Sequence, residues 1–125
     1  MKIAIVGSRR FVNYAMFSSK VDEILKDTDK SNLIIVSGGA LGVDSMAKDY
    51  AKYNKLGYLE FLPDYQKYEG KIAPLKRNEL IANECDKMIA FQLNNSNGTN
   101  HVVALAKKLG KKVKLIKLTT NTWNE

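Results

Sequence analysis

Short apolar runs alternate with longer segments of mixed polarity along the whole chain. The apolar runs have the length and residue types of strands, and they lie at Lys2–Val6, Leu33–Val36, Tyr58–Leu62, Lys87–Phe91 and Val113–Leu118. Helical spacing of apolar residues in the segments between them predicts helices at Asn13–Lys26, Gly42–Lys55, Pro74–Glu84 and Gly98–Leu109. This alternation is typical of repeated β-α-β units, in which the strands are parallel.

The segment after the second apolar run shows the helical pattern clearly. The side chains that recur at the spacing of one helix face are Val43, Met46, Ala47, Tyr50, Ala51 and Tyr53 or Asn54. We expect this face to pack against the sheet. Gly57 and Gly110 follow helical segments, and we expect both to end a helix in the left-handed conformation that glycine adopts without strain.

Parallel strands joined by right-handed crossovers send every loop that follows a strand to the same edge of the sheet. We therefore predict one α/β domain at residues 1–118 and a polar tail at 119–125. The domain is expected to be a Rossmann-like three-layer fold whose mainly parallel, five-stranded sheet has the order 3-2-1-4-5. In this order the ligand crevice lies between the loops Gly7–Arg10 and Asn94–Thr99, and the crossover after the third strand carries Arg77 across it.

Two glycine-containing turns follow the first two predicted strands. Gly7-Ser8-Arg9-Arg10 offers backbone N–H groups, a hydroxyl and two guanidinium groups, a combination that suits phosphate. Ser37-Gly38-Gly39-Ala40 continues into Gly42-Val43-Asp44, and its small residues let a ligand approach the backbone closely. The first turn, taken alone, fits a plain strand-to-helix connection with arginines in water equally well.

Polar side chains at the starts of the later helices complete the candidate site. Asp44 is expected to cap the second helix, with contact to a ribose hydroxyl or to a water as the functional alternative. Arg77 is followed by Asn78, and we expect it to point away from the inward face of its helix. The side chains expected on that inward face are Leu75, Leu80 and Ile81. Such an arginine suits a phosphate or carboxylate, and it equally suits the protein surface.

The polar turn before the last helix provides Gly98 for close approach and Ser96 and Thr99 as hydroxyl donors. His101, just beyond, is a candidate acid, base or base-stacking group, or else an ordinary polar helix residue. Asp44 and His101 are the candidate catalytic residues. The residues expected to bind the ligand or its phosphate are Gly7, Ser8, Arg9, Arg10, Ser37, Gly38, Gly39, Asp44, Arg77, Asn78, Gly98 and Thr99.

The 125 residues carry a formal net charge of +7, which is compatible with nucleic acid, an anionic lipid or a small phosphorylated ligand. No run approaches the roughly 18 apolar residues of a membrane span, and the first apolar run turns too early for a secretory leader. We therefore expect a cytoplasmic protein with no membrane partner. Cys85, the single cysteine, is expected to be buried. No metal or cofactor is expected, because the chain lacks metal-ligand spacing, a Walker phosphate loop and the glycine fingerprint of nicotinamide binding.

Five segments taken in order resemble the YspA-like branch of the SLOG superfamily. They are GSRRF, VSGGALGVDSMA, FLPDYQKYEGKIAPLKRNELIA, CDKMIAF and NGTNHVVALAKKLGKKV. The chain is also more distantly similar to the DprA/Smf proteins of DNA processing and to the LOG phosphoribohydrolases. The resemblance implies a Rossmann-like domain that binds nucleotides or nucleotide-derived ligands, often as a homo-oligomer. LOG enzymes use a glutamate to assist cleavage of the N-glycosidic bond, and Val102 occupies the matching position here.

The function favoured by these observations is binding of a nucleotide or nucleotide-derived signal, without catalysis. The first alternative is an N-glycosidic hydrolase that acts on nucleoside 5′-monophosphates, with Asp44, Glu79 or His101 as its acid or base. The second alternative is single-stranded nucleic-acid binding through the basic surface.

Overall fold

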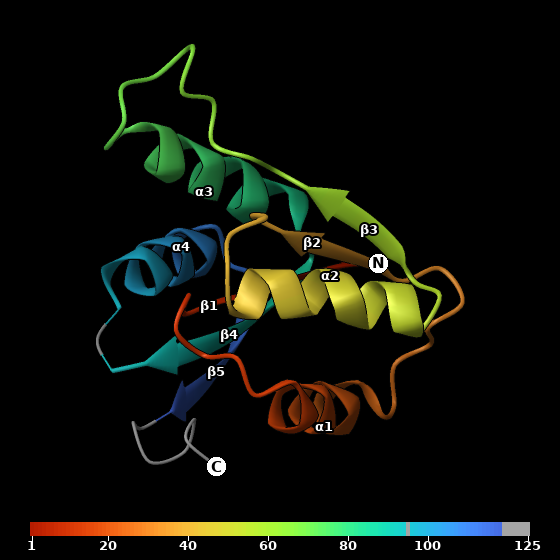
Figure 1. Ribbon diagram of the computed structural model, residues 1–125. Helices are drawn as coiled ribbons and strands as arrows, with labels where there is room; N and C mark the ends of the chain where they lie inside the picture. Colours follow the sequence, from red (N-terminus) through yellow and green to blue (C-terminus); the bar gives the residue numbers. More distant parts are fainter. Residues whose placement is uncertain (95, 119–125) are drawn as a thin grey trace.

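Five parallel strands form the central sheet in the order β3-β2-β1-β4-β5 (Figure 1). The computed structural model describes residues 1–94 and 96–118, so the predicted tail at 119–125 lies outside the described residues. The strands are β1 (Lys2–Gly7), β2 (Ile34–Ser37), β3 (Gly57–Glu60), β4 (Lys87–Leu93) and β5 (Lys112–Leu118). The helices are α1 (Tyr14–Leu25), α2 (Val43–Tyr53), α3 (Ala73–Glu84) and α4 (Asn97–Lys108). The predicted fold class and strand order are confirmed.

Alternation of side chains along the strands divides the core between the two faces of the sheet. Ile3 and Ile5 of β1 point to the face covered by α1 and α2. Ala4 and Val6 point to the opposite face, which α3 and α4 cover. Cys85 is buried in this second part of the core, as predicted. The three layers follow from this pattern, because β1, β2 and β4, which are largely buried, need helices on both faces of the sheet.

Helix α1 begins where a side chain satisfies its first free N–H groups. Asn13 Oδ1 accepts a hydrogen bond from the Met16 N–H group at 3.1 Å. Phe17, on the buried face of α1, packs against Phe91 of β4 with ring centroids 5.0 Å apart.

Among the residues that the structure describes, no helix has both the length and the apolar character needed to span a bilayer.

One of the two predicted helix-ending glycines has a different role. Lys55, with φ of 55°, takes the left-handed position after α2, while Gly57 is the first residue of β3. The hydrogen bonds from Leu56 N–H to the Ala51 carbonyl and from Lys55 N–H to the Lys52 carbonyl close the helix before Gly57 is reached. The prediction for Gly57 is therefore wrong, and that for Gly110, whose φ is 77°, is confirmed.

Candidate functional site

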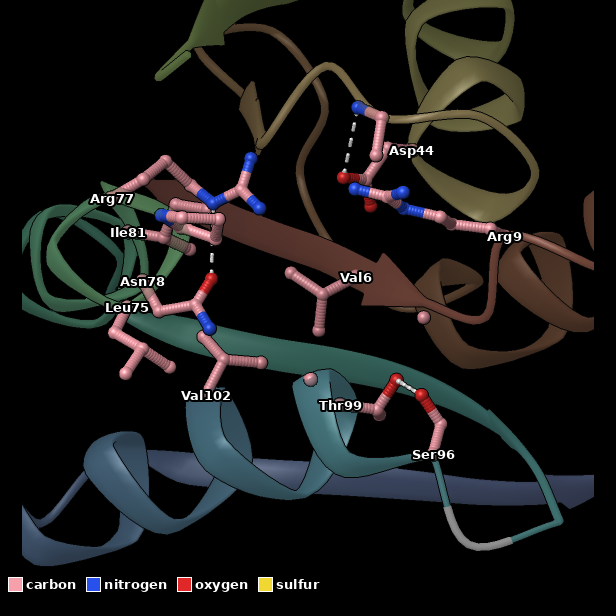
Figure 2. Close-up of a pocket in the computed structure, with 14 residues that line it drawn as sticks. Val6, Arg9, Asp44, Leu75, Arg77, Asn78, Ile81, Ser96, Thr99 and Val102 are labelled. Atoms are coloured by element: carbon pink, nitrogen blue, oxygen red, sulfur yellow. Dashed lines mark hydrogen bonds between the residues drawn. The ribbon is translucent and has the colours of Figure 1, made fainter. Parts of the chain in front are cut away.

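The loops at the carboxyl edge of the sheet enclose a cavity of about 290 Å³ (Figure 2). It is lined by residues from the end of β1 and the loop after it, the β2–α2 loop and the start of α2, α3, and the first half of α4 with the residue before it. The cavity thus lies beside β1 and β4, where the winding of the chain reverses, and this is the place where open parallel sheets bind their ligands. The predicted location of the crevice agrees with this geometry.

Seven of the twelve predicted binding residues line the cavity, namely Gly7, Arg9, Asp44, Arg77, Asn78, Gly98 and Thr99. The other five are Ser8, Arg10, Ser37, Gly38 and Gly39, which do not belong to its lining. The lining also contains Ser96, the other predicted hydroxyl donor of the last turn, and residues that the sequence did not single out for binding, which are Val6, Ala40, Pro74, Leu75, Ile81 and Val102. Most of these are apolar, and an apolar residue in a strand or helix signals the core rather than a pocket wall.

Arg77 is the most deeply placed cation of the cavity. Its side chain is only 9% exposed, its Nη1 donates to the Gly38 carbonyl at 2.6 Å, and its Nε donates to Asn78 Oδ1 at 3.0 Å. Burial lowers the pKa of Arg77, and the nearby Asp44 opposes this shift. A guanidinium remains charged under such conditions, so the cavity contains a fixed positive charge.

The predicted orientation of the α3 side chains is partly wrong. Ile81 is buried as expected, but Leu75 and Leu80 are 42% and 51% exposed, and Arg77 is the side chain that turns inward. Arg77 and Ile81 are one helical turn apart and therefore share a face of α3. That face meets the sheet and the β2–α2 loop, where the Gly38 carbonyl provides the polar partner that a buried arginine requires.

Gly38 shapes the cavity without lining it. A Cβ atom at this position would lie 2.5 Å from Arg77 Nη1 and 2.9 Å from Asp44 Oδ2. The missing side chain therefore allows the guanidinium to reach the Gly38 carbonyl. Ser37 supports the same region, since its hydroxyl donates to the Asp44 backbone carbonyl at 3.3 Å.

Asp44 does not cap α2, contrary to the preferred expectation. The N-cap position is Gly42 and makes no side-chain hydrogen bond, while Asp44 Oδ2 accepts from the Ala40 N–H group at 3.2 Å, outside the helix. The Asp44 side chain is nearly buried, and this burial raises its pKa from 3.8 to about 6. The Ala40 N–H group and the charges of Arg77 and Arg9 limit the increase. The cavity therefore contains a carboxyl group that changes charge close to neutral pH.

The first glycine turn uses most of its polar backbone within the protein. The Ser8 N–H group donates to the Phe91 carbonyl at 3.0 Å, and the Ser8 carbonyl accepts from the Val43 N–H group at 3.1 Å. The Arg10 N–H group donates to Ser8 Oγ at 3.1 Å. The Ser8 and Arg10 N–H groups are therefore already paired within the protein, and phosphate binding by this turn stays a prediction. Arg9 is the residue of this turn whose side chain reaches the cavity, beside Asp44 (Figure 2).

The start of α4 forms the wall opposite Arg9 and Asp44 (Figure 2). Ser96, Gly98 and Thr99 line this wall, and Thr99 Oγ1 donates to Ser96 Oγ at 3.3 Å. The first N–H groups of a helix have no partner inside that helix, and they lie at its positive dipole end. The wall therefore suits an anion. Within the predicted loop Asn94–Thr99, Asn95 lies outside the described residues.

His101 lies behind the cavity rather than in its lining. Its Nδ1 is 3.1 Å from Nδ2 of Asn78, and Asn78 in turn accepts from Arg77 Nε. A contact of this kind holds Asn78 and Arg77 in place, while a catalytic role for His101 stays a prediction. Within 1–94 and 96–118, no group of three or more His, Cys, Asp or Glu side chains is arranged to hold a metal ion.

Known proteins are similar to the chain in sequence and in fold. The sequence model of the YspA, cpYpsA-related SLOG family matches residues 1–68. The Gene 61 protein of Mycobacterium phage D29 is 29% identical over 115 residues, which are 87% of this chain and 90% of that protein. Among solved structures, DNA processing protein A from Helicobacter pylori matches the fold with a TM-score of 0.74 and 25% identity. That structure was determined to explain the single-stranded DNA binding mode of the Helicobacter pylori protein. The match spans 98% of this chain and 68% of the Helicobacter pylori chain. DNA processing protein A from Streptococcus pneumoniae shares the fold, with a TM-score of 0.57 at 18% identity over 90% of this chain and 57% of that one.

Proposed function

The chain belongs to the YspA, cpYpsA-related SLOG family, and from this premise we propose that it binds a nucleotide or another nucleotide-derived, phosphorylated ligand. The observation that carries the proposal is the meeting of Arg9, Arg77 and the first turn of α4 around one cavity. Cations and a helix start are the features that proteins use to hold phosphate. Their arrangement on three separate elements encloses an anion from several sides.

The remaining wall of the cavity is apolar and suits the base or the ribose of such a ligand. It is formed by Val6, Leu75, Ile81 and Val102. Small-ligand pockets combine a mainly apolar lining with a few placed polar groups and have volumes of roughly 300 to 1,000 Å³. A volume of about 290 Å³ is at the lower limit of that range and suits a single nucleotide unit.

Isothermal titration calorimetry with nucleoside monophosphates and inorganic phosphate tests the proposal. Arg9→Ala removes a cation that lines the cavity, and we expect it to weaken nucleotide binding about tenfold, which corresponds to about 1.4 kcal/mol. Arg10→Ala is the matched control, because Arg10 is the adjacent arginine and lies outside the lining. Absence of binding across the panel, or equal losses in the two variants, would refute the assignment.

Single-stranded nucleic acid is a second candidate ligand. The similarity to the Helicobacter pylori protein supports it, since single-stranded DNA binding is described for that protein. The net charge of +7 favours the same partner. Affinity for an oligonucleotide that falls steeply with rising salt concentration is the expected sign, and no binding at low salt excludes this candidate.

Hydrolysis of the N-glycosidic bond is a third candidate, and the position of Asp44 favours it. A carboxyl group in the cavity with a pKa of about 6 is suited to proton transfer near neutral pH. Chromatography for free base after long incubation with nucleoside monophosphates tests this reaction. Release that persists unchanged in Asp44→Asn eliminates Asp44 as the acid or base.

A further inference from the structure

A second hollow shares Arg77 with the ligand cavity. After β3 the chain runs back along α3 through residues 61–72 before it enters that helix (Figure 1). Between this loop and α3 is a groove of about 370 Å³. Its lining includes the ring of Tyr68, the cations Lys67, Lys76 and Arg77, and the apolar side chains Leu62 and Leu80. We propose that this groove, called the loop–α3 groove below, binds the second nucleotide of a single strand of nucleic acid whose first nucleotide occupies the cavity.

Continuity with the cavity is the first argument, and it rests on the proposed function of that cavity. Arg77 lines both hollows, and it is held in this position by the Gly38 carbonyl and by Asn78. A ligand whose phosphate contacts Arg77 from the cavity can therefore extend past this side chain into the groove. A mononucleotide occupies only the cavity, whereas the second nucleotide of a dinucleotide can occupy the adjoining groove.

The side chains of the groove provide the second argument. Tyr68 has two ammonium groups close to its ring, with Lys67 Nζ at 5.3 Å and Lys76 Nζ at 5.9 Å from the ring centroid. Tyr65, in the same loop, is 60% exposed. Aromatic rings for base stacking, interleaved with cations for the phosphates, are the combination that single-strand binding sites use.

Two carboxylates also line the groove, and both already have partners. Glu79 Oε2 is 3.4 Å from Lys76 Nζ, while Asp64 Oδ1 accepts from the N–H groups of Gln66 and Lys67 at 3.1 Å each. Lys67 has no ion pair among the described residues, so its ammonium is free to meet a phosphate. Arg77 contributes the further positive charge at the boundary with the cavity.

The exposed apolar side chains at the edges of the groove fit the same occupant. Leu62 is 60% exposed, and Leu80, on the facing helix, is 51% exposed. Apolar side chains gathered on one exposed surface mark a binding site more often than isolated ones do. A nucleobase is flat and apolar on its faces, so it can cover these side chains while its phosphate stays with Lys67 and Arg77.

The test compares two probes that differ by one nucleotide. Calorimetry is performed with adenosine and thymidine 5′-monophosphates and with the corresponding 5′-phosphorylated dinucleotides. Because one further base can stack, we expect the dinucleotides to bind about tenfold tighter than the monophosphates. Tyr68→Ala is expected to abolish this gain and leave monophosphate affinity unchanged, whereas Tyr68→Phe, which keeps the ring, retains it.

A matched control shows whether the effect of Tyr68→Ala is specific to the groove or follows from losing any exposed aromatic side chain. Tyr53→Ala removes an exposed tyrosine of α2, outside the groove, and is expected to leave both affinities unchanged. Dinucleotides that bind no tighter than monophosphates overturn the groove proposal and leave the nucleotide pocket standing. Equal weakening of both probes in Tyr68→Ala also overturns it. If neither probe binds the wild-type protein, the pocket and the groove proposals fail together.

Discussion

Asp44 is expected to destabilise the protein at neutral pH, and this can be measured with Asp44→Asn. Burial raises the pKa of the Asp44 carboxyl from 3.8 to about 6 in the folded protein, while the unfolded chain retains the ordinary value. This difference corresponds to about 3 kcal/mol between the charged and the protonated form. Asparagine has nearly the same shape, and its carbonyl oxygen can still accept from the Ala40 N–H group.

The sign of the effect depends on which state loses its proton first. Below pH 3.8 the carboxyl is protonated in both states, and its stabilising contribution is complete. As the pH rises, the unfolded chain ionises first, so this contribution is lost progressively and is gone once the pH exceeds the folded value of about 6. Asp44→Asn should therefore increase the free energy of unfolding by only about 0.5 kcal/mol near pH 4 and by up to about 3 kcal/mol at pH 7.5.

Urea unfolding of both proteins between pH 4 and pH 8 measures the difference. With a slope of about 1 to 3 kcal/mol per molar urea, the midpoint of the variant should shift upward by about 1 to 3 M at pH 7.5. Asp49→Asn is the control, because Asp49 is an exposed carboxylate of the same helix. A variant that is less stable than wild type at pH 7.5, or one whose shift is the same at pH 4 and pH 7.5, would contradict the reasoning.

Three further predictions concern the framework around the cavity and are checked by urea unfolding. Arg77→Met should lower the free energy of unfolding by about 3 kcal/mol, because it leaves two buried acceptors without a donor, and an equally stable variant would contradict the described hydrogen bonds. Gly42→Ala should lower the free energy of unfolding by about 2 kcal/mol or more, because φ at Gly42 is 73° and the new Cβ would lie 2.4 Å from the Ser8 carbonyl oxygen. The control is Gly98→Ala, whose new Cβ enters open space on a helix, and its free energy of unfolding should stay within about 1 kcal/mol of wild type. Phe17→Ala should lower stability by about 3 to 5 kcal/mol, because its fully buried ring contacts three other aromatic rings, and a loss below about 1 kcal/mol would show that the site collapses easily.

The local pattern of apolar and polar residues was sufficient to predict the strands and helices and the edge of the sheet at which the site forms. The apolar runs and the helical spacing identify five strands and four helices, and the boundaries in the structure differ from the predicted ones by two residues at most. Because parallel strands all end at one edge, Gly7, Arg9, Asp44, Gly98 and Thr99 had to meet there. Chain connectivity alone imposes this convergence.

Contacts between distant segments decided what each of these residues does. Arg77 and Gly38 are 39 positions apart, and only the packing of α3 on the β2–α2 loop turns the guanidinium inward. Locally, Asp44 turns to the Ala40 N–H group four residues back instead of a capping position, and Arg9 lines the cavity while the adjacent Arg10 does not. Periodicity describes which side of an element is apolar, but a buried polar group takes its partner from whatever the fold places beside it. For that reason the sequence by itself determined where the site lies, and the tertiary structure decided which side chains face it and which support it.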